Sequence, residues 1–200
     1  RKIKFSGFYR ILFYLPAICT STIVGTVFSK IFETNRGYLN VILRALHLDF
    51  LCQQWLATPK TALACLLFVN IWQWTGYSML MYYTNMLNIP QELYESATID
   101  GAGSFKQFVY ITFPLLRGTH ITLIILDILG ALKFFDLSYV LTDGGPAHAT
   151  ETFSTYIYTK SFNTFQQGQA STIVVFMFLI AMVLTVIQLK IYYKKDKEMN

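Results

Sequence analysis

The sequence predicts an all-α protein that crosses a membrane, and two features of its charge carry this expectation. Charged residues make up 14% of the 200 residues and hydrophobic residues 54%, whereas a soluble domain has about 25% charged residues. Four long stretches also contain only one charged residue, Asp127, among them. They are Ile11–Ser29, Thr61–Gln91, Gly118–Leu132 and Ser161–Leu189. Because a transmembrane helix needs about 20 apolar residues, this pattern excludes a soluble enzyme, a disordered chain and a disulfide scaffold.

The first two spans are expected on either side of a polar connection. The first covers about Ile11–Ile31, where Pro16 lacks a backbone donor and should kink the helix. Neighbouring helices can then satisfy the freed carbonyl. Residues 32–59 carry charges and turn residues, which favours a loop with short helical pieces. The second span runs from Thr61 to about Leu87.

Two further spans follow a second polar segment, residues 91–117. The third covers about Gly118–Leu141 and is ended sharply by the turn Asp143–Pro146. The fourth, about Ala170–Tyr192, is rich in Val, Ile, Leu, Phe and Met. Four spans put both ends of the chain on one side. Since basic residues cluster at both ends, that side and residues 91–117 are expected to face the cytoplasm.

The net charge of +5 is explained by this positive-inside bias rather than by a nucleic-acid partner. No basic stripe interleaved with aromatic residues lies on a polar segment, as nucleic-acid binding would require. The three cysteines form no CxxC pair, and His47, His120 and His148 lack the spacing of metal ligands. We therefore expect neither a metal site nor a nucleic-acid interface.

A short helix is expected just after the second span. Pro90 suits the first turn of a helix, and Glu92 and Glu95 suit the positive end of its dipole. The pair Asp100-Gly101 should stop this helix, because glycine adopts the left-handed conformation without penalty.

A second short helix is expected from Ser104, where Ser104–Gln107 fits a capping box. Its apolar face comprises Phe105, Phe108 and Ile111. Two short helices around a glycine hinge, tethered to a span at each end, can dock into a partner's groove and convert its movement into movement of the spans.

This segment resembles the EAA loop of binding-protein-dependent ABC importer permeases. The family pattern is Glu-Ala-Ala, three residues, Gly, nine residues, Ile, one residue, Leu-Pro. Here Glu95-Ser96-Ala97 is followed at that spacing by Gly101, Ile111 and Phe113-Pro114. Ser96 and Phe113 depart from the pattern by small changes of volume. Further features are similar to the carbohydrate branch of the family: Leu141–Pro146, Thr150, Tyr158 and Phe162.

The resemblance implies a type I importer permease bundle with six spans and a cytoplasmic coupling helix. Four spans are present, so the first two are expected to be missing from a transmembrane domain that fills residues 1–200, with its EAA loop at 90–116. It implies coupling to an ATPase through Glu92, Glu95, Ser96, Ala97, Asp100 and Gly101.

The resemblance also implies the partners of this chain. They are a second permease in a heterodimer, two ATPase subunits, an extracellular sugar-binding protein and the bilayer of a bacterial inner membrane. The chain has no GxxxxGK[ST] phosphate loop, so ATP and Mg are expected on the ATPase subunits and no cofactor on this chain.

A sugar is expected to meet one polar and aromatic face of the second span. Asn70, Gln73, Trp74 and Tyr77 lie at i, i+3, i+4 and i+7. Asp127 is an ionisable residue inside the third span, where such residues usually face a cavity or partner, and Phe134 follows it. Maltose-type permeases have substrate contacts at corresponding points. The alternative for all six residues is interhelical hydrogen bonding and packing.

The turn formed by Asp143, Gly144, Gly145 and Pro146 is expected to meet the binding protein, with a partnerless exposed loop as the alternative. The leading functional hypothesis is a permease subunit that imports a carbohydrate, with an oligosaccharide as the expected substrate. One alternative has the same architecture and imports another solute, such as glycerol phosphate. A membrane-embedded enzyme is a further alternative, but it would need paired acids, a Ser/His arrangement or a metal cluster.

Overall fold

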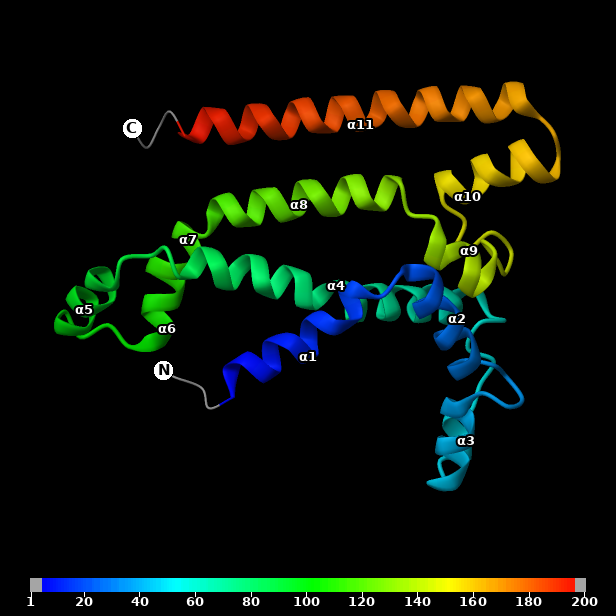
Figure 1. The fold of residues 1–200 in the computed structure, drawn as a ribbon, viewed down its shortest axis with the longest axis horizontal. Coiled ribbons are helices and arrows are strands. Elements are labelled where there is room, and N and C mark those ends of the chain that lie inside the picture. Colours follow the sequence, from blue (N-terminus) through cyan, green and yellow to red (C-terminus); the bar gives the residue numbers. More distant parts are fainter. Residues whose placement is uncertain (1–4, 197–200) are drawn as a thin grey trace.

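The computed structural model describes residues 5–196, and every regular element in that range is a helix (Figure 1). Three short turns, η1 to η3, have 3₁₀ (η1) or π geometry (η2 and η3). In chain order the elements are α1 (Ser6–Ile18), α2 (Ser21–Ile31), α3 (Tyr38–Ala45), η1 (Asp49–Leu51), α4 (Pro59–Met86), α5 (Gln91–Ile99), α6 (Ser104–Gln107), η2 (Phe108–Thr112), α7 (Phe113–Leu115), α8 (Arg117–Leu132), α9 (Asp136–Thr142), α10 (Phe153–Tyr158), η3 (Thr159–Asn163) and α11 (Gln167–Asp196).

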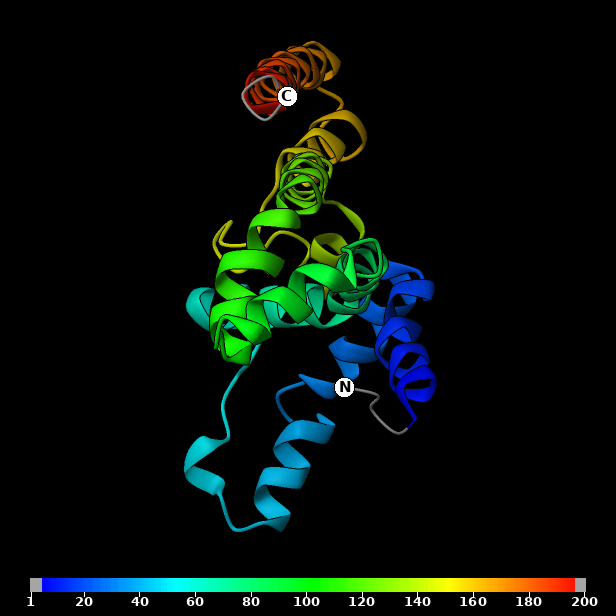
Figure 2. The same cartoon turned by 90° about the vertical axis from the view of Figure 1, so that its left-hand side faces the viewer.

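The long helices α4, α8 and α11 run along a common direction and are stacked above one another (Figures 1 and 2). α1 packs against α4, and α2 packs against α9. α5 and α6 lie at the same end of the molecule as the start of α1 and the end of α11, whereas α3, α9 and α10 lie at the opposite end (Figure 1). We call these the coupling end and the distal end.

Among the described residues, one helix is long and apolar enough to cross a membrane by itself, Gln167–Lys190 within α11. Only 6% of its most apolar stretch is buried by the rest of the chain. Two bent helix pairs raise the number to three if each is one span. α4 has 28 residues, the length of a span, but is less apolar. The expected fourth span is thus a single helix, and the count of four stays a prediction.

The first expected span is not one kinked helix but two helices at 94° to each other. The break falls at Cys19–Thr20 rather than at Pro16, which stays inside α1. Thr20 caps α2 by accepting a hydrogen bond from the backbone N–H of Ile23 (3.5 Å). The side-chain amide of Gln73 on α4 donates to the carbonyl of Cys19 (3.1 Å). A neighbouring helix therefore satisfies the backbone group that the break leaves free.

A glycine allows α1 and α4 to approach closely. A Cβ added to Gly76 of α4 would overlap the carbonyl group of Phe13 in α1. Nearer the coupling end, the guanidinium of Arg10 lies 4.1 Å from the centre of the Tyr83 ring, a cation–π contact. The two helices are thus joined by backbone contact at one level and by a charged contact at another.

The third expected span also breaks before its predicted end. α8 ends at Leu132, and α9 is a separate short helix that packs on α2. Hydroxyl groups from the following segment bond to the carbonyls at this break. Thr152 donates to the carbonyl of Phe134 (2.6 Å), and Ser154 donates to that of Leu132 (3.4 Å). The predicted stop after Leu141 is confirmed, because α9 ends at Thr142.

The buried core lies toward the distal end, where α2, α4 and α9 meet. Its members are Val24, Phe32, Cys65, Leu66, Val69, Leu137 and Leu141. Asn40, only 2% exposed, holds the 32–59 connection onto this core. Its amide donates to the carbonyls of Thr34 (2.9 Å) and Gln53 (3.0 Å) and accepts from the indole N–H of Trp55 (2.8 Å). The connection is therefore a folded structure rather than a loose loop.

We predict that Gly76→Ala destabilises the protein by about 1–3 kcal/mol, because the added methyl group overpacks the α1–α4 contact. Gly130→Ala in α8 is the matched control. No atom lies within 4 Å of its added Cβ, and alanine is the better helix former by ~1 kcal/mol. Thermal unfolding of the detergent-solubilised protein measures both changes. An unchanged melting temperature for Gly76→Ala would contradict the prediction.

Candidate coupling segment and transport pathway

Residues 90–116, here called the coupling segment, begin with a helix that ends on glycine, as predicted. Gly101 has a φ of +77°. The N–H of Gly101 bonds to the carbonyl of Thr98 (3.1 Å), and the N–H of Ala102 bonds to that of Ala97 (2.9 Å). This pair of bonds is a Schellman motif, which satisfies the last carbonyls of a helix and reverses the chain. α5 is therefore followed by a defined corner.

The predicted restart at Ser104 is confirmed, but the predicted capping box is wrong. Gly103 precedes the first helical residue, and it provides no side-chain cap. The side chain of Gln107 reaches across the corner instead. Its amide nitrogen donates to the Thr98 hydroxyl (2.9 Å), to the Ala102 carbonyl (3.1 Å) and, at 3.5 Å, to the carbonyl of Tyr94. Gln107 thus ties α6 to α5.

A second tie joins α5 to the π-helical turn η2. The hydroxyls of Tyr94 and Thr112 lie 2.8 Å apart, and Thr112 is only 4% exposed. We did not predict this bond between Tyr94 and Thr112 from the sequence. The sequence signal that could have predicted this bond is a set of polar residues on the inward-facing sides of two amphipathic helices. Together with Gln107, these residues hold the short helices of the coupling segment against one another. We therefore also call this segment, residues 90–116, the elbow.

The outer face of the elbow is uncovered. Glu92, Glu95, Ser96 and Asp100 are exposed, as is Gly101, while Ala97 is half-buried. Large apolar side chains of the same segment are also exposed: Ile99 (86%), Phe105 (81%), Tyr110 (77%) and Phe108 (51%). Of the predicted apolar face of the second helix, Phe105 and Phe108 are therefore largely uncovered, whereas Ile111 is half-buried. A mixed acidic and apolar surface of this kind is typical of an interface with another protein.

The polar residues on one face of α4 have different environments. Gln73 is 1% exposed, and its amide nitrogen donates at the α1–α2 break to the Cys19 carbonyl and to the Ser21 hydroxyl (3.4 Å), while its Oε1 is buried without a partner among the described residues. These two bonds are the interhelical hydrogen bonding that the alternative interpretation expects. Trp74 is 44% exposed, and its ring meets that of Tyr77 edge-on with centres 6.2 Å apart. Asn70 is half-buried.

The two candidate sugar-contact residues that follow the coupling segment, Asp127 and Phe134, have different surroundings. Asp127 is exposed on α8 and has no hydrogen-bond partner among the residues that the structure describes. Phe134 lies beyond the end of α8 and packs against the distal core. The structure does not bring Phe134 into contact with the Trp74–Tyr77 pair, so the ring is part of the fold at the α8–α9 break.

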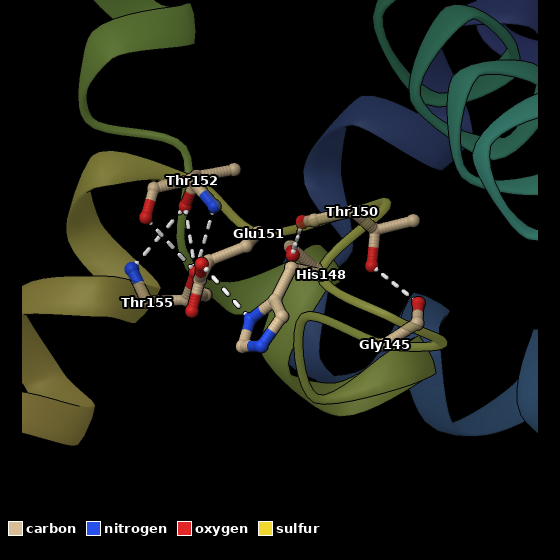
Figure 3. Close-up of polar contacts among 7 residues, drawn as sticks. Gly145, His148, Thr150, Glu151, Thr152 and Thr155 are labelled. Atoms are coloured by element: carbon tan, nitrogen blue, oxygen red, sulfur yellow. Dashed lines mark hydrogen bonds and ion pairs between the residues drawn. The ribbon is translucent and has the colours of Figure 1, made fainter. Parts of the chain in front are cut away.

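The turn after α9 is held by a network of threonine hydroxyls (Figure 3). Thr150, 3% exposed, donates to the Gly145 carbonyl (2.8 Å) and lies 2.6 Å from the Thr142 hydroxyl. Its own carbonyl accepts from Ser138 (2.6 Å). The next residues form a capping box between Thr152 and Thr155, and we did not predict it from the sequence.

Within this turn, the predicted contact residues differ in exposure. Asp143 is exposed with a φ of +50°, whereas Gly144 is buried against Glu151. Gly145 and Pro146 are half-buried. The exposed tip instead includes His148, whose ring nitrogen Nδ1 lies 3.1 Å from the Glu151 carboxylate. The turn lies at the distal end, opposite the coupling segment (Figure 1).

Where α4 and α8 meet at the coupling end, a cavity of about 440 Å³ opens beside the coupling segment. It is lined by both apolar and polar side chains. They include Met81, Asn85, Asn88, Leu115, Thr119 and Thr122.

An exposed segment between two long helices, with a structured turn at the opposite end, fits a membrane transport component. Residues 4–195 match the family described as "Binding-protein-dependent transport system inner membrane component". The chain belongs to this family, which confirms the resemblance and the expected class of transport subunit rather than enzyme.

Two relatives are similar over almost the whole chain. One, a probable ABC transporter permease (YurN) of Bacillus subtilis, is 36% identical over 98% of this chain and 66% of its own length. A probable starch degradation products transport permease (AmyD) of Thermoanaerobacterium thermosulfurigenes is 33% identical over 100% of this chain and 67% of its own. The chain thus spans about two thirds of the length of these relatives.

The fold is also similar to that of a solved structure. A chain of a bacterial ABC transporter involved in the import of the acidic polysaccharide alginate matches with a TM-score of 0.86. The identity is 23%, over 96% of this chain and 68% of that chain. The type I importer permease fold is therefore confirmed.

We predict that Gln107→Leu loosens the elbow, because it removes the amide that holds α5 to α6. Amide hydrogen exchange in residues 94–108 should accelerate by about tenfold or more, as expected for the loss of several hydrogen bonds of ~1 kcal/mol each. Lys106→Leu, at the neighbouring exposed position, should leave the exchange unchanged. Equal exchange in the two variants would show that Gln107 is not the tie.

Proposed function

We propose that this chain is the permease subunit of an ATP-driven importer that takes up a carbohydrate, specifically an oligosaccharide, delivered by an external binding protein. The family description supports dependence on a binding protein. The AmyD relative is named for starch degradation products, and the similar solved structure belongs to an alginate importer. The observation that carries the proposal is the rigid, uncovered elbow tethered to α4 and α8.

In the proposed mechanism, the elbow is the surface on which an ATPase subunit docks. Its exposed acids and aromatic rings would enter a groove of that subunit, and closure of an ATPase pair around ATP and Mg would pull the elbow. Because internal hydrogen bonds hold α5 and α6 together, the pull moves the elbow as a unit instead of unfolding it. The spans then rock between inward-open and outward-open states.

The proposed assembly contains a second permease, two ATPase subunits and the binding protein at the distal end. Both ends of this chain and the elbow face the cytoplasm, in agreement with the basic residues near the ends. The turn 143–150 then faces outward, where its threonine network keeps the tip in a fixed position for a binding protein. The uncovered apolar surface of α11 is left for lipid or for the second permease.

Within the bilayer, the proposed sugar contacts are Trp74 and Tyr77 with Asn70 beside them. Aromatic faces and an amide suit a neutral sugar, which offers apolar ring faces and hydroxyl groups. Asp127 would accept hydrogen bonds from hydroxyls if the second permease closes the pathway around it. Gln73 is better assigned to the α1–α2 break because its amide nitrogen already donates there.

We predict that Gly101→Ala in the full-length protein lowers sugar uptake by about tenfold. The added Cβ meets no atom within 4 Å, so the effect comes from the φ of +77°; a side chain there costs ~1–2 kcal/mol, and 1.4 kcal/mol is about tenfold. Gly103→Ala is the matched control, since its φ is −68° and its surroundings are also open. Uptake into proteoliposomes containing the whole transporter measures both. Equal uptake would refute a coupling role for the corner.

We also predict that Trp74→Ala raises the KM for uptake by about tenfold, as loss of an aromatic platform worth ~1.4 kcal/mol would. Phe68→Ala removes an exposed ring from another face of α4 and should leave KM unchanged. The sugar is first identified by stimulation of ATPase activity in a screen of mono-, di- and trisaccharides. An equal change in both variants would place Trp74 outside the pathway.

A further inference from the structure

The coupling segment is joined to α8 through a sharp bend. Ser104–Leu115 and Arg117–Leu132 meet at 62°, with Leu116 between them. Leu116 is only 5% exposed. A single residue that joins two helices nevertheless allows the angle between them to change unless other contacts fix it. His120, one turn into α8, makes such contacts on both sides of the bend.

Both ring nitrogens of His120 are engaged. Nε2 lies 3.1 Å from the carbonyl oxygen of Phe113, before the bend, and Nδ1 lies 2.8 Å from the hydroxyl of Tyr82 on α4. A carbonyl oxygen can only accept, so Nε2 carries the proton and donates it. In the neutral ring, Nδ1 is then the acceptor, and Tyr82 donates to it. These two contacts thus define which ring nitrogen of neutral His120 carries the proton, and which atom donates each of its two hydrogen bonds.

The rings strengthen this arrangement. The centre of the His120 ring lies 4.6 Å from that of Phe113 and 5.2 Å from that of Tyr82. The imidazole therefore fills the corner between α4, α7 and α8. The next residue on α4, Tyr83, contacts Arg10 of α1. At the coupling end of α4, Tyr82 thus contacts α8 and the adjacent Tyr83 contacts α1.

The contacts continue into the coupling segment without a gap. Tyr94 of α5 bonds to Thr112, the residue before Phe113. The Phe113 carbonyl bonds to His120, which bonds to Tyr82. A chain of hydrogen bonds and one peptide link therefore leads from the docking elbow to both α4 and α8.

We propose that His120, with Tyr82 and the Phe113 carbonyl, is a positioning group that locks the bend, so that movement of the coupling segment is passed to α4 and α8 together. This inference rests on the proposed function of the coupling segment and adds the residues that transmit its movement. Without the lock, the elbow turns about Leu116, and ATP hydrolysis proceeds with little movement of the spans.

The first test compares uptake with ATP hydrolysis in proteoliposomes containing the complete transporter. The transported probe is the saccharide that stimulates the wild-type ATPase most strongly. His120→Leu should lower the sugar transported per ATP by about fivefold or more, the order expected for losing two hydrogen bonds, while ATP hydrolysis continues. Tyr82→Phe should give a smaller loss. His120→Gln, which offers a donor and an acceptor at similar spacing, should restore part of the ratio.

Tyr83→Phe is the matched control, because it removes a hydroxyl from the neighbouring position but keeps the ring over which Arg10 lies. It should retain the wild-type ratio. A purely structural role for His120 would lower the melting temperature and the amount of assembled transporter but leave the ratio unchanged, and that result would overturn the proposal. So would a normal ratio in both His120→Leu and Tyr82→Phe.

The second test needs only ATP and vanadate, so it is independent of the sugar. Spin labels are placed at the exposed positions Lys106 and Lys133 after replacement of the three cysteines, Cys19, Cys52 and Cys65. In the otherwise unmodified protein their distance should stay the same on vanadate trapping, because the elbow and α8 move together. In His120→Leu it should shift or broaden.

A distance that changes equally with and without His120 overturns the lock. If no saccharide is transported but the distances behave as expected, the carbohydrate proposal fails and the lock stands. If uptake is normal and His120→Leu changes neither the ratio nor the distance, the proposed function stands and the lock fails.

Discussion

The structure depends on one constraint: a helix that breaks inside a membrane frees backbone groups that water cannot reach, and another side chain must bond to them. Each of the two breaks in the expected spans meets this demand from outside its own helix. Gln73 of α4 serves the α1–α2 break, and Thr152 with Ser154 serves the α8–α9 break. These bonds turn two flexible interruptions into fixed corners, and the corners allow α2 and α9 to pack together in the distal core.

The two ends of the molecule differ in how far their side chains are covered. The distal core and the Thr150 network hold one end in a set shape, whereas the elbow at the coupling end leaves its acidic and aromatic side chains uncovered. Between them, α4 contacts α1, α2, α8 and α9. α4 is therefore the helix through which the two ends are connected, and the proposed transmission of movement from the elbow depends on its contacts at the coupling end.

Features encoded within a few residues were predictable from the sequence, whereas those that depend on distant partners were not. The Gly101 corner, the restart at Ser104 and the stop after Thr142 follow from local backbone chemistry. The breaks at Cys19 and Lys133 do not, because Gln73 and Thr152 lie far away in sequence. Gln107 shows the limit clearly: its local pattern fits a capping box, but its amide bonds across the corner instead. The residues of this segment and the family's spacing predicted the two short helices and the corner between them, whereas the polar ties between these helices became visible only in the fold.

The bare surface of α11 has a consequence for how the protein is made. The helix satisfies its backbone within itself and gains little burial from the rest of the chain, so its stability comes mainly from the bilayer. It can enter the membrane as an independent unit during synthesis and associate with the other helices afterwards. Within this chain its apolar side chains therefore fit against few neighbours, whereas Gly76 and Gln73 fit against another helix at close range.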